Sequence, residues 1–463
     1  MKAFVGIFAT AFLACTSNAW AIREQSAFLT LSTDTQVNST TYQTILTRTI
    51  TLNAAAAVVA VADGRYFPVD APAGQVAVSI DGSIGSTSIA VTDWGSSSHP
   101  VQHSFNAVAN ASLAAGTHTI ALVASSSASR PGRFKVGSGS GLAVFVQPLS
   151  QINAQYLAGQ SSNINLTTYS PPTVDVTEGS SSRPSTVILT HNISNPGSGA
   201  TSIVSLISGR SFNSCNSGIN NGRGDALWGI FSNGTCQSTG NASWSVDDID
   251  GGAELQGAMY AHSIYPLGIG ETKTISFRAS ELAFGSDQPS PHENGVCYEV
   301  GSAKLLSAVG GLVMGSASGG TNSFCSTYTW KCVASTTGWP GCPAGGTDVA
   351  IGSTTVTIPA GHDGIVYFSA KTRIQADNTD SFATATLQIK VDGVAVGTIG
   401  DQQLAAGVGQ SSRTLTSSYV SAPGPNSSTL SVGSHTVSVS VNVSGTLLHH
   451  VSVPQDVVLT YFD

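Results

Sequence analysis

Charged side chains are scarce in this chain, where Asp, Glu, Lys and Arg make up 10% of 463 residues, against about 25% in an average soluble protein. The formal net charge is −8 and the 18 Lys and Arg form no basic stripe, which argues against nucleic-acid binding. Hydrophobic residues still make up 41%, so the chain is not disordered throughout. The surface must consist mainly of Ser, Thr, Asn, Gln and Gly.

Helical periodicity and strong catalytic signatures are also missing. Only the short windows 151–157 and 253–261 have helix-like spacing. The sequence contains no G-x-S-x-G elbow, no H-E-x-x-H, no phosphate-binding Gly loop followed by Lys and no dinucleotide fingerprint. These absences weigh against an enzyme, and neither a catalytic residue nor an organic cofactor is predicted.

The first 21 residues predict export. A basic start, an apolar run over 3–14 and a small-x-small site ending at Ala21 are typical of a signal peptide. The mature chain is expected to begin at Ile22 and to be secreted or held at the cell surface. A competing lipoprotein site at Cys15 is a poorer match. No later segment offers about twenty uninterrupted apolar residues, so no integral membrane span is expected.

One of the seven cysteines lies in the signal segment, and the others form an even set in an exported chain. Three disulfides are the prediction for such a set. Zinc is the alternative, but the spacing lacks the close C-x2-C pairs of structural zinc sites. Cys215 with Cys236, which would close a Gly/Asn-rich loop, is the first pairing expected. The six cysteines are Cys215, Cys236, Cys297, Cys325, Cys332 and Cys342.

Short alternating runs of Val, Ile and Thr, separated by Gly, Asn, Asp, Ser and Pro clusters, predict an all-β fold of sandwiches. Two distant segments carry the same pattern, an alternating strand that ends in Asp-Gly at 76–82 and again at 387–393. Each is followed by Leu-x-x-Gly-x-His, at 113–118 and 430–435. The chain therefore contains a duplicated domain.

The shared residues of the two segments fit turn chemistry. Asp-Gly after an alternating strand predicts a tight hairpin, where Gly accepts positive φ without steric cost. His118 and His435 stand at the start of the next strand, and we expect a structural role for both.

The order of these landmarks resembles the jelly-roll modules of C1q/TNF-like proteins, phage tail fibres and bacterial surface proteins. That resemblance implies either a sandwich that trimerises, which would make the protein a homotrimer, or a ligand-binding sandwich, with binding by the loops at the chain end. The segments 187–206 and 266–277 resemble the Ig-like repeats of bacterial cell-surface proteins, apart from a long insertion containing Cys215 and Cys236.

The expected architecture is thus all-β and multi-domain, with two jelly-roll-like domains flanking a disulfide-stapled Ig-like region. The expected parts are a signal peptide 1–21, a jelly-roll-like sandwich 22–150, a linker 151–182, an Ig-like sandwich with insertion 183–283, a Cys-rich extension 284–352 and a second jelly-roll-like sandwich 353–463.

Two sets of side chains are candidates for a site, and each has a structural alternative. Exposed tryptophans would stack on sugar rings, whereas buried ones pack in a core. Carboxylates gathered in one turn would suit Ca²⁺, but their spacing falls short of an EF-hand loop, so a solvated acidic turn is the alternative. The tryptophans are Trp228, Trp244, Trp330 and Trp339, and the candidate calcium ligands are Asp247, Asp248, Asp250 and Glu254.

Two weaker motifs remain. His99 and His103 could hold a metal from a loop, although Pro100 prevents a helix from aligning them. Arg223-Gly224-Asp225 is the tripeptide read by integrins, in a context that indicates an exposed turn.

The leading functional hypothesis is a secreted or cell-surface adhesion protein that binds a glycan or a surface protein and performs no catalysis. The alternatives are a structural subunit of an extracellular fibre and a secreted hydrolase with accessory sandwiches.

Overall fold

The computed structural model confirms an all-β chain made of several sandwiches. The described parts of the two windows with helix-like spacing are strands, at 155–158 and 256–267. The structure describes residues 21–68, 74–90, 103–126, 134–148, 155–158, 173–175, 178–179, 186–195, 201–213, 224–244, 256–282, 296–299, 304–309, 314–318, 330–334, 346–377, 382–405, 411–445, 450–454 and 458–462.

The strands fall into three consecutive sandwiches, at 27–148, 155–309 and 314–462. The first contains β1 (Ala27–Thr30), β2 (Thr35–Val37), β3 (Gln43–Leu52), β4 (Ala56–Pro68), β5 (Gly74–Ile80), β6 (Ser83–Ala90), β7 (His103–Leu113), β8 (Gly116–Ser126), β9 (Phe134–Val136) and β10 (Gly141–Pro148). The second contains β11 (Gln155–Ala158), β12 (Thr173–Asp175), β13 (Glu178–Gly179), β14 (Thr186–Ser194), β15 (Thr201–Asn213), β16 (Gly224–Ser232), β17 (Thr235–Trp244), β18 (Gln256–Leu267), β19 (Thr272–Leu282), β20 (Val296–Glu299) and β21 (Lys304–Val309). The third contains β22 (Met314–Ser318), β23 (Trp330–Ala334), β24 (Gly346–Ile358), β25 (Tyr367–Asp377), β26 (Phe382–Val391), β27 (Val394–Ala405), β28 (Ser411–Val420), β29 (Gly433–Gly445), β30 (His450–Pro454) and β31 (Val458–Phe462).

All three sandwiches have the same strand order. The first has a large sheet β1-β10-β4-β9-β2, with β7 on β4, and a small sheet β3-β8-β5-β6. The second repeats it as β11-β21-β15-β20-β12, with β18 on β15, and β14-β19-β16-β17. The third repeats it as β22-β31-β25-β30-β23, with β28 on β25, and β24-β29-β26-β27. The chain therefore contains three copies of one domain. The second sandwich, whose sequence resembles Ig-like repeats, has the same strand order as the first and the third.

The Cys-rich stretch 284–352 supplies strands to two sandwiches. β20 and β21 pair with β15 of the second sandwich. β22 and β23 pair with β31 and β30 of the third, in the positions that β1 and β2 hold in the first.

The hairpin turns agree with the triplication. Asp81-Gly82 and Asp392-Gly393 form the predicted tight turns. The φ angles are 49° and 82° in the first turn and 49° and 80° in the second, so that the aspartates as well as the glycines have positive φ. Asn233 and Gly234, between β16 and β17, have φ of 48° and 78°. This backbone is that of a type I′ turn, which accepts Asn-Gly as readily as Asp-Gly.

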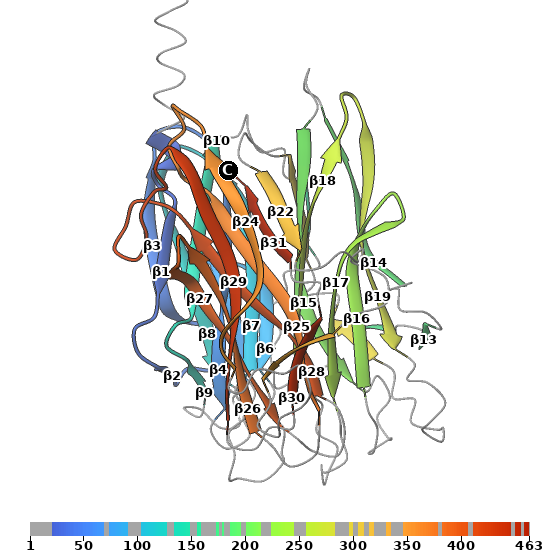
Figure 1. Cartoon of the computed structure of the whole chain (residues 1–463). Coiled ribbons are helices and arrows are strands. Elements are labelled where there is room, and N and C mark those ends of the chain that lie inside the picture. The colour runs from blue at the N-terminus through green and yellow to red at the C-terminus, as the bar shows by residue number, and fades with distance from the viewer. Residues whose placement is uncertain are drawn as a thin grey trace, which may run out of the picture.

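The three sandwiches contact one another in a cyclic pattern. β6 of the first lies against β15 and β18 of the second, β17 of the second against β28 and β25 of the third, and β27 of the third against β4 and β7 of the first. The equivalent edge strand thus meets the equivalent pair of strands each time, and the three interfaces close a ring. At the second interface β17 also pairs with β28, through Ser243 and Ser412, so that the two sheets are continuous there. Figure 1 shows the sandwiches with their strands running in broadly the same direction. The homotrimer that the resemblance implied is not supported, because the three sandwiches of the ring belong to one chain.

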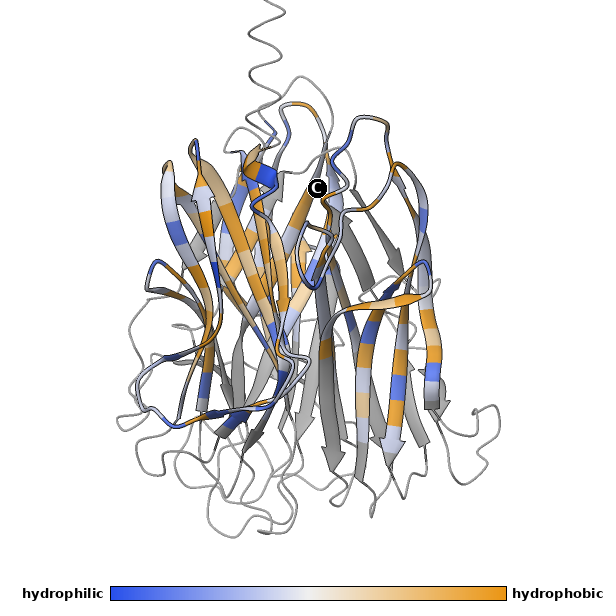
Figure 2. Cartoon of the chain, turned by 90° about the vertical axis from the view of Figure 1, so that its left-hand side faces the viewer, coloured by the Kyte–Doolittle hydropathy of each residue, from blue (hydrophilic) through white to orange (hydrophobic). Residues whose placement is uncertain are grey.

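The ring has a shared core. Val58, Ala60 and Ala62 on β4 pack inside the first sandwich, whereas Val59 and Val61 belong to a cluster that includes residues of all three sandwiches. A strand buried on both faces reads as a continuous apolar run rather than an alternating one. In Figure 2, continuously apolar strands are orange along their length, whereas strands with one polar face show orange bands that alternate with paler or blue ones.

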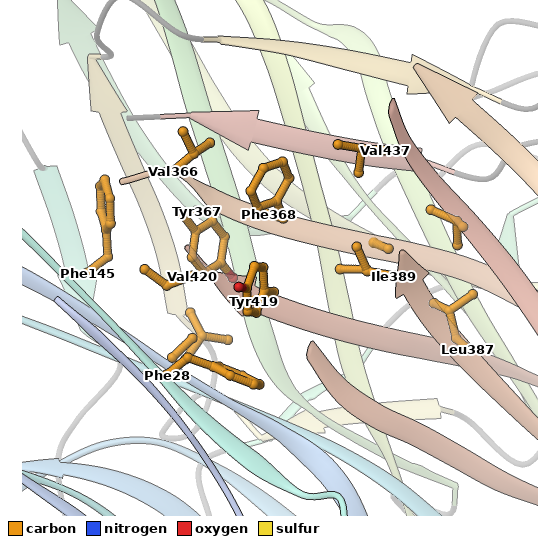
Figure 3. Close-up of a cluster of buried hydrophobic side chains, with 14 of the residues drawn as sticks. Phe28, Phe145, Val366, Tyr367, Phe368, Leu387, Ile389, Tyr419, Val420 and Val437 are labelled. Carbon is orange, nitrogen blue, oxygen red and sulfur yellow. The ribbon is translucent and has the colours of Figure 1, made fainter. Parts of the chain in front are cut away.

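We call the interface between the third and first sandwiches the seam. Its aromatic side chains come from both sides, and Figure 3 shows Phe28 and Phe145 facing Tyr367 and Tyr419. The rings of Phe28 and Tyr419 lie edge to face, 5.2 Å apart. The chain runs from the first sandwich to the second and on to the third. The other two interfaces join consecutive sandwiches, whereas the seam joins the first sandwich to the last.

An ion pair also crosses the seam. Arg23, just before β1, donates from Nε to Asp363 Oδ2 at 2.5 Å and from Nη2 to Asp363 Oδ1 at 3.0 Å. Its Nη2 also donates to the Ile365 carbonyl at 2.6 Å, and Nη1 to Gln147 Oε1 at 3.1 Å. The two charged side chains are only 7% and 11% exposed. The residues that follow the expected cleavage site thus join the first sandwich to the third.

Candidate functional site

The structure places Trp228 in a core. It is fully buried on β16, and its indole Nε1 donates to the Tyr260 carbonyl at 3.0 Å. Its ring therefore cannot stack on a sugar, and the structural alternative holds for this residue. Trp244 is the last residue of β17 and Trp330 the first of β23, but their side chains, and all of Trp339, lie outside the described residues.

The carboxylates considered for calcium, Asp247, Asp248, Asp250 and Glu254, lie outside the described residues, between β17 and β18. Within the described ranges, no group of three or more His, Cys, Asp or Glu side chains gathers to hold a metal ion. The calcium site stays a prediction.

Cys236 is the one cysteine whose side chain falls among the described residues. It lies on β17 and is disulfide-bonded. Cys297 and Cys332 lie on β20 and β23, but their side chains are outside the described residues. Cys215, Cys325 and Cys342 lie outside the described residues altogether. The pairing scheme therefore stays a prediction.

Two equivalent His–Asp pairs hold turns together. His118 Nδ1 lies 2.7 Å from Asp81 Oδ2, and His435 Nδ1 lies 2.7 Å from Asp392 Oδ2. The carboxylate also accepts a backbone N–H at 2.8 Å in each case, from the residue that follows the histidine. The structural role expected of both histidines agrees with this geometry.

The other ring nitrogen of each histidine also faces an acceptor. His118 Nε2 lies 2.9 Å from the Ala114 carbonyl, and His435 Nε2 lies 2.8 Å from the Ser431 carbonyl. A neutral imidazole donates from one nitrogen only, so both contacts are satisfied only in the charged form. The hydrogen bond to the aspartate, followed by that to the carbonyl, raises the pKa of each histidine. The pKa of Asp392 is lowered mainly by His435, and that of Asp81 mainly by the backbone N–H of Thr119.

The second sandwich has the same hairpin turn but no His–Asp pair at the equivalent positions. Asn233 Oδ1 accepts from the Thr274 N–H at 2.8 Å, as the aspartates do in the other two sandwiches. The residue before Thr274 is Lys273, where the others have histidine. Its turn is therefore expected to be insensitive to pH near neutrality.

These pairs predict a pH dependence of stability. A histidine whose folded pKa exceeds the unfolded value of about 6.5 stabilises the fold fully below that value, and the contribution is lost as pH rises through the folded pKa. The aspartates, with lowered pKa values, stabilise above about pH 4 and lose this as pH falls. We expect H118A and H435A each to lower the free energy of unfolding by about 1 kcal/mol at pH ~6 and by less at pH ~9. K273A, measured in the same urea titrations, should show no such difference, and equal losses at both pH values would contradict the charged pair.

The long connections between strands leave the ring from one end. In the first sandwich Gly74 pairs with Ala90 and Ser126, so the ends of β6 and β8 and the start of β5 lie together. The connections that begin and end there lie at 69–73, 91–102 and 127–133 in the first sandwich, 214–223, 245–255 and 283–295 in the second, and 378–381, 406–410 and 446–449 in the third. We call this the long-connection end.

Opposite the long-connection end are the tight turns that carry the His–Asp pairs. The second sandwich has connections at least twice as long as those of the third. The candidate calcium ligands fall in 245–255, Trp244 stands at the last residue before it, and Gly224 of the Arg-Gly-Asp tripeptide begins β16 at the same end. His103 begins β7 at this end too, whereas His99 lies outside the described residues.

Comparisons with known proteins give no family. No family model matches the chain, and no curated protein does. Among solved structures, PNGF-II is similar with a TM-score of 0.27 and 8% identity, over 62% of this chain and 64% of PNGF-II. The tandem CBM22 modules of Paenibacillus barcinonensis Xyn10C give a TM-score of 0.16 and 9% identity, over 67% of this chain and 91% of theirs. Scores this low bear on no function.

No helix in the ranges that the structure describes is long and apolar enough to cross a membrane.

Proposed function

We propose that the chain is an exported, non-catalytic binding protein that recognises a glycan or a surface protein at its long-connection end. The observation that carries the proposal is the common end at which nine connections leave three fused sandwiches. Connections held by a rigid scaffold are where proteins most often bind their partners. A ring with a shared core supplies such a scaffold.

The second sandwich offers the largest recognition surface within this proposal. Its connections 214–223 and 283–295 are longer than their counterparts in the other two sandwiches, and its three connections contain the carboxylates of 247–254 and one of the expected disulfide cysteines, Cys215. A disulfide that tethers a long connection lowers the entropy lost when a partner binds. We propose that this sandwich makes the main contact and that calcium, if bound, orders 245–255.

A connection exchange tests the location. The full chain is screened on a glycan array, together with a variant in which 406–410 of the third sandwich replaces 245–255. We expect the variant to lose the glycans that the natural chain binds, by at least tenfold in affinity. V432S, a change in a tight turn at the opposite end where Val432 is 59% exposed, serves as the control and should bind normally.

Two outcomes would count against the proposal. An array without any hit removes the glycan partner, and pull-down from a cell-surface extract with the same variants then tests the protein partner. Equal loss of binding in V432S would move the site away from the long-connection end.

Calcium has its own test. EDTA should lower the melting temperature of the natural chain and leave that of the exchange variant unchanged, because only the natural chain contains Asp247, Asp248, Asp250 and Glu254. If EDTA leaves the natural chain unchanged, those carboxylates form a solvated turn.

A further inference from the structure

A buried carboxyl lies in the seam. Asp63, on β4, is 0% exposed, and its Oδ1 accepts from Asn106 Nδ2 at 2.5 Å and from Thr416 Oγ1 at 2.9 Å. Asp63 and Asn106 belong to the first sandwich, and Thr416 and its neighbour Ser418 belong to the third. Both sides of the seam therefore contribute to this cluster.

Three buried oxygens of the cluster lack a hydrogen bond of good geometry. Among the described residues, Asp63 Oδ2, Asn106 Oδ1 and Ser418 Oγ make none, although all three residues are at most 1% exposed and Ser418 is close enough to Asp63 to lower the pKa of its carboxyl. A buried polar atom without a partner costs free energy, and a buried charge without one costs much more. The seam thus combines one carboxylate with an amide oxygen and a hydroxyl oxygen, and each of the three groups has a lone pair that could bind a cation.

No cationic side chain of the described part of the chain forms an ion pair with Asp63. Lys371 stands opposite Thr416 in the register of β25 and β28 and is also buried. Its charge acts instead on His262 of the second sandwich, whose pKa is lowered first by burial and then by Lys371. Lys371, the lysine paired with Thr416, therefore does not form an ion pair that balances a negative charge on Asp63.

We propose that this cluster binds one monovalent metal cation of the Na⁺ or K⁺ type, with Asp63 Oδ2, Asn106 Oδ1 and Ser418 Oγ as its protein ligands. Oxygen donors suit hard cations. A single carboxylate neutralises a single positive charge, whereas Ca²⁺ would bring an excess charge into a buried interface. Because the ligands come from both sides of the seam, the ion would hold the third sandwich against the first.

The competing occupant of Asp63 is a proton. Burial raises the pKa of Asp63, and the side chains of Ser418, Asn106 and Thr416 oppose that rise only in part. A protonated carboxyl would need no metal ion, and its stabilising effect would disappear as pH rises through the folded pKa. The two occupants therefore respond to different variables, the identity of the salt and the pH.

The test is thermal unfolding of the full chain at neutral pH in chloride salts of Na⁺, K⁺ or N-methyl-D-glucamine, at equal ionic strength of about 0.15 M. We expect melting temperatures higher by about 2 to 4 °C in Na⁺ or K⁺, since an ion that binds only the folded state stabilises it. The ion that gives the larger shift identifies the occupant. D63N should melt at the same temperature in all three salts, and D34N, which alters an exposed carboxylate, should keep the natural response.

A second variant keeps the test decisive if D63N folds poorly. S418A removes one ligand and leaves the charge, so the Na⁺ or K⁺ concentration at half-maximal stabilisation should rise by about tenfold. The proposal is overturned if the natural chain melts equally in all salts, which would assign a proton to Asp63, or if D63N responds to the salts as the natural chain does.

Discussion

Replacing Arg23 by Ala is expected to lower the free energy of unfolding by about 3 to 5 kcal/mol, because it leaves the Asp363 carboxylate buried without its partner. The pair has the two-point geometry of a strong guanidinium–carboxylate contact, and Arg23 also donates to the Ile365 carbonyl. D363A should cost a similar amount. Urea titration of both variants measures these losses.

The control for this pair is a more exposed one. Lys273 lies 3.5 Å from Glu271 in the turn of the second sandwich, and K273A should change stability by less than about 1 kcal/mol. The double variant R23A/D363A should lose less than the sum of the two single losses, since the second change removes the unpaired charge left by the first. If R23A costs no more than K273A, Arg23 does not hold the seam.

Replacing Trp228 by Ala is expected to cost about 3 to 5 kcal/mol, because a large fully buried side chain leaves a cavity. Trp228 packs between the two sheets of the second sandwich and donates to the Tyr260 carbonyl. Tyr260 in turn bonds through its hydroxyl to Ser369 of the third sandwich at 2.6 Å. The loss should therefore spread beyond the second sandwich into its interface with the third.

W228F is the matched comparison, since it keeps most of the buried volume and loses the indole hydrogen bond. We expect W228F to lower the free energy of unfolding by less than half as much as W228A, with both variants measured by differential scanning calorimetry. A loss below about 1 kcal/mol for W228A would mean that Trp228 is not in a core.

The sequence predicted the strands and the tight turns because both depend on local chemistry. Alternation with period two and Asp-Gly at positive φ are properties of a few neighbouring residues. Two copies were found in this way. The third was missed because its turn has Asn233 in place of Asp, Lys273 in place of His and a one-residue-longer loop after Leu267. A search for Asn-Gly followed by Thr-Ile would have found it.

The ring could have been suspected from one pattern. Residues 56–62 and 142–146 are continuously apolar, whereas a strand with one wet face alternates. The polar contacts of the seam had no such signal, because Arg23 and Asp363 are far apart in sequence and each alone looks like a surface residue. The sequence left both alternatives open for Trp228, and only the packing around it decides.

Thiol labelling at Val61 tests the three-sandwich ring most directly. Val61 is 0% exposed and lies on the face of β4 that packs in the shared core. In the native protein, we expect V61C to react with a thiol reagent at least about a thousandfold more slowly than T49C, whose residue is exposed on β3, because its reaction requires opening of the ring. Three sandwiches strung along the chain without a shared core would leave that face of β4 in water, and V61C would then react as fast as T49C.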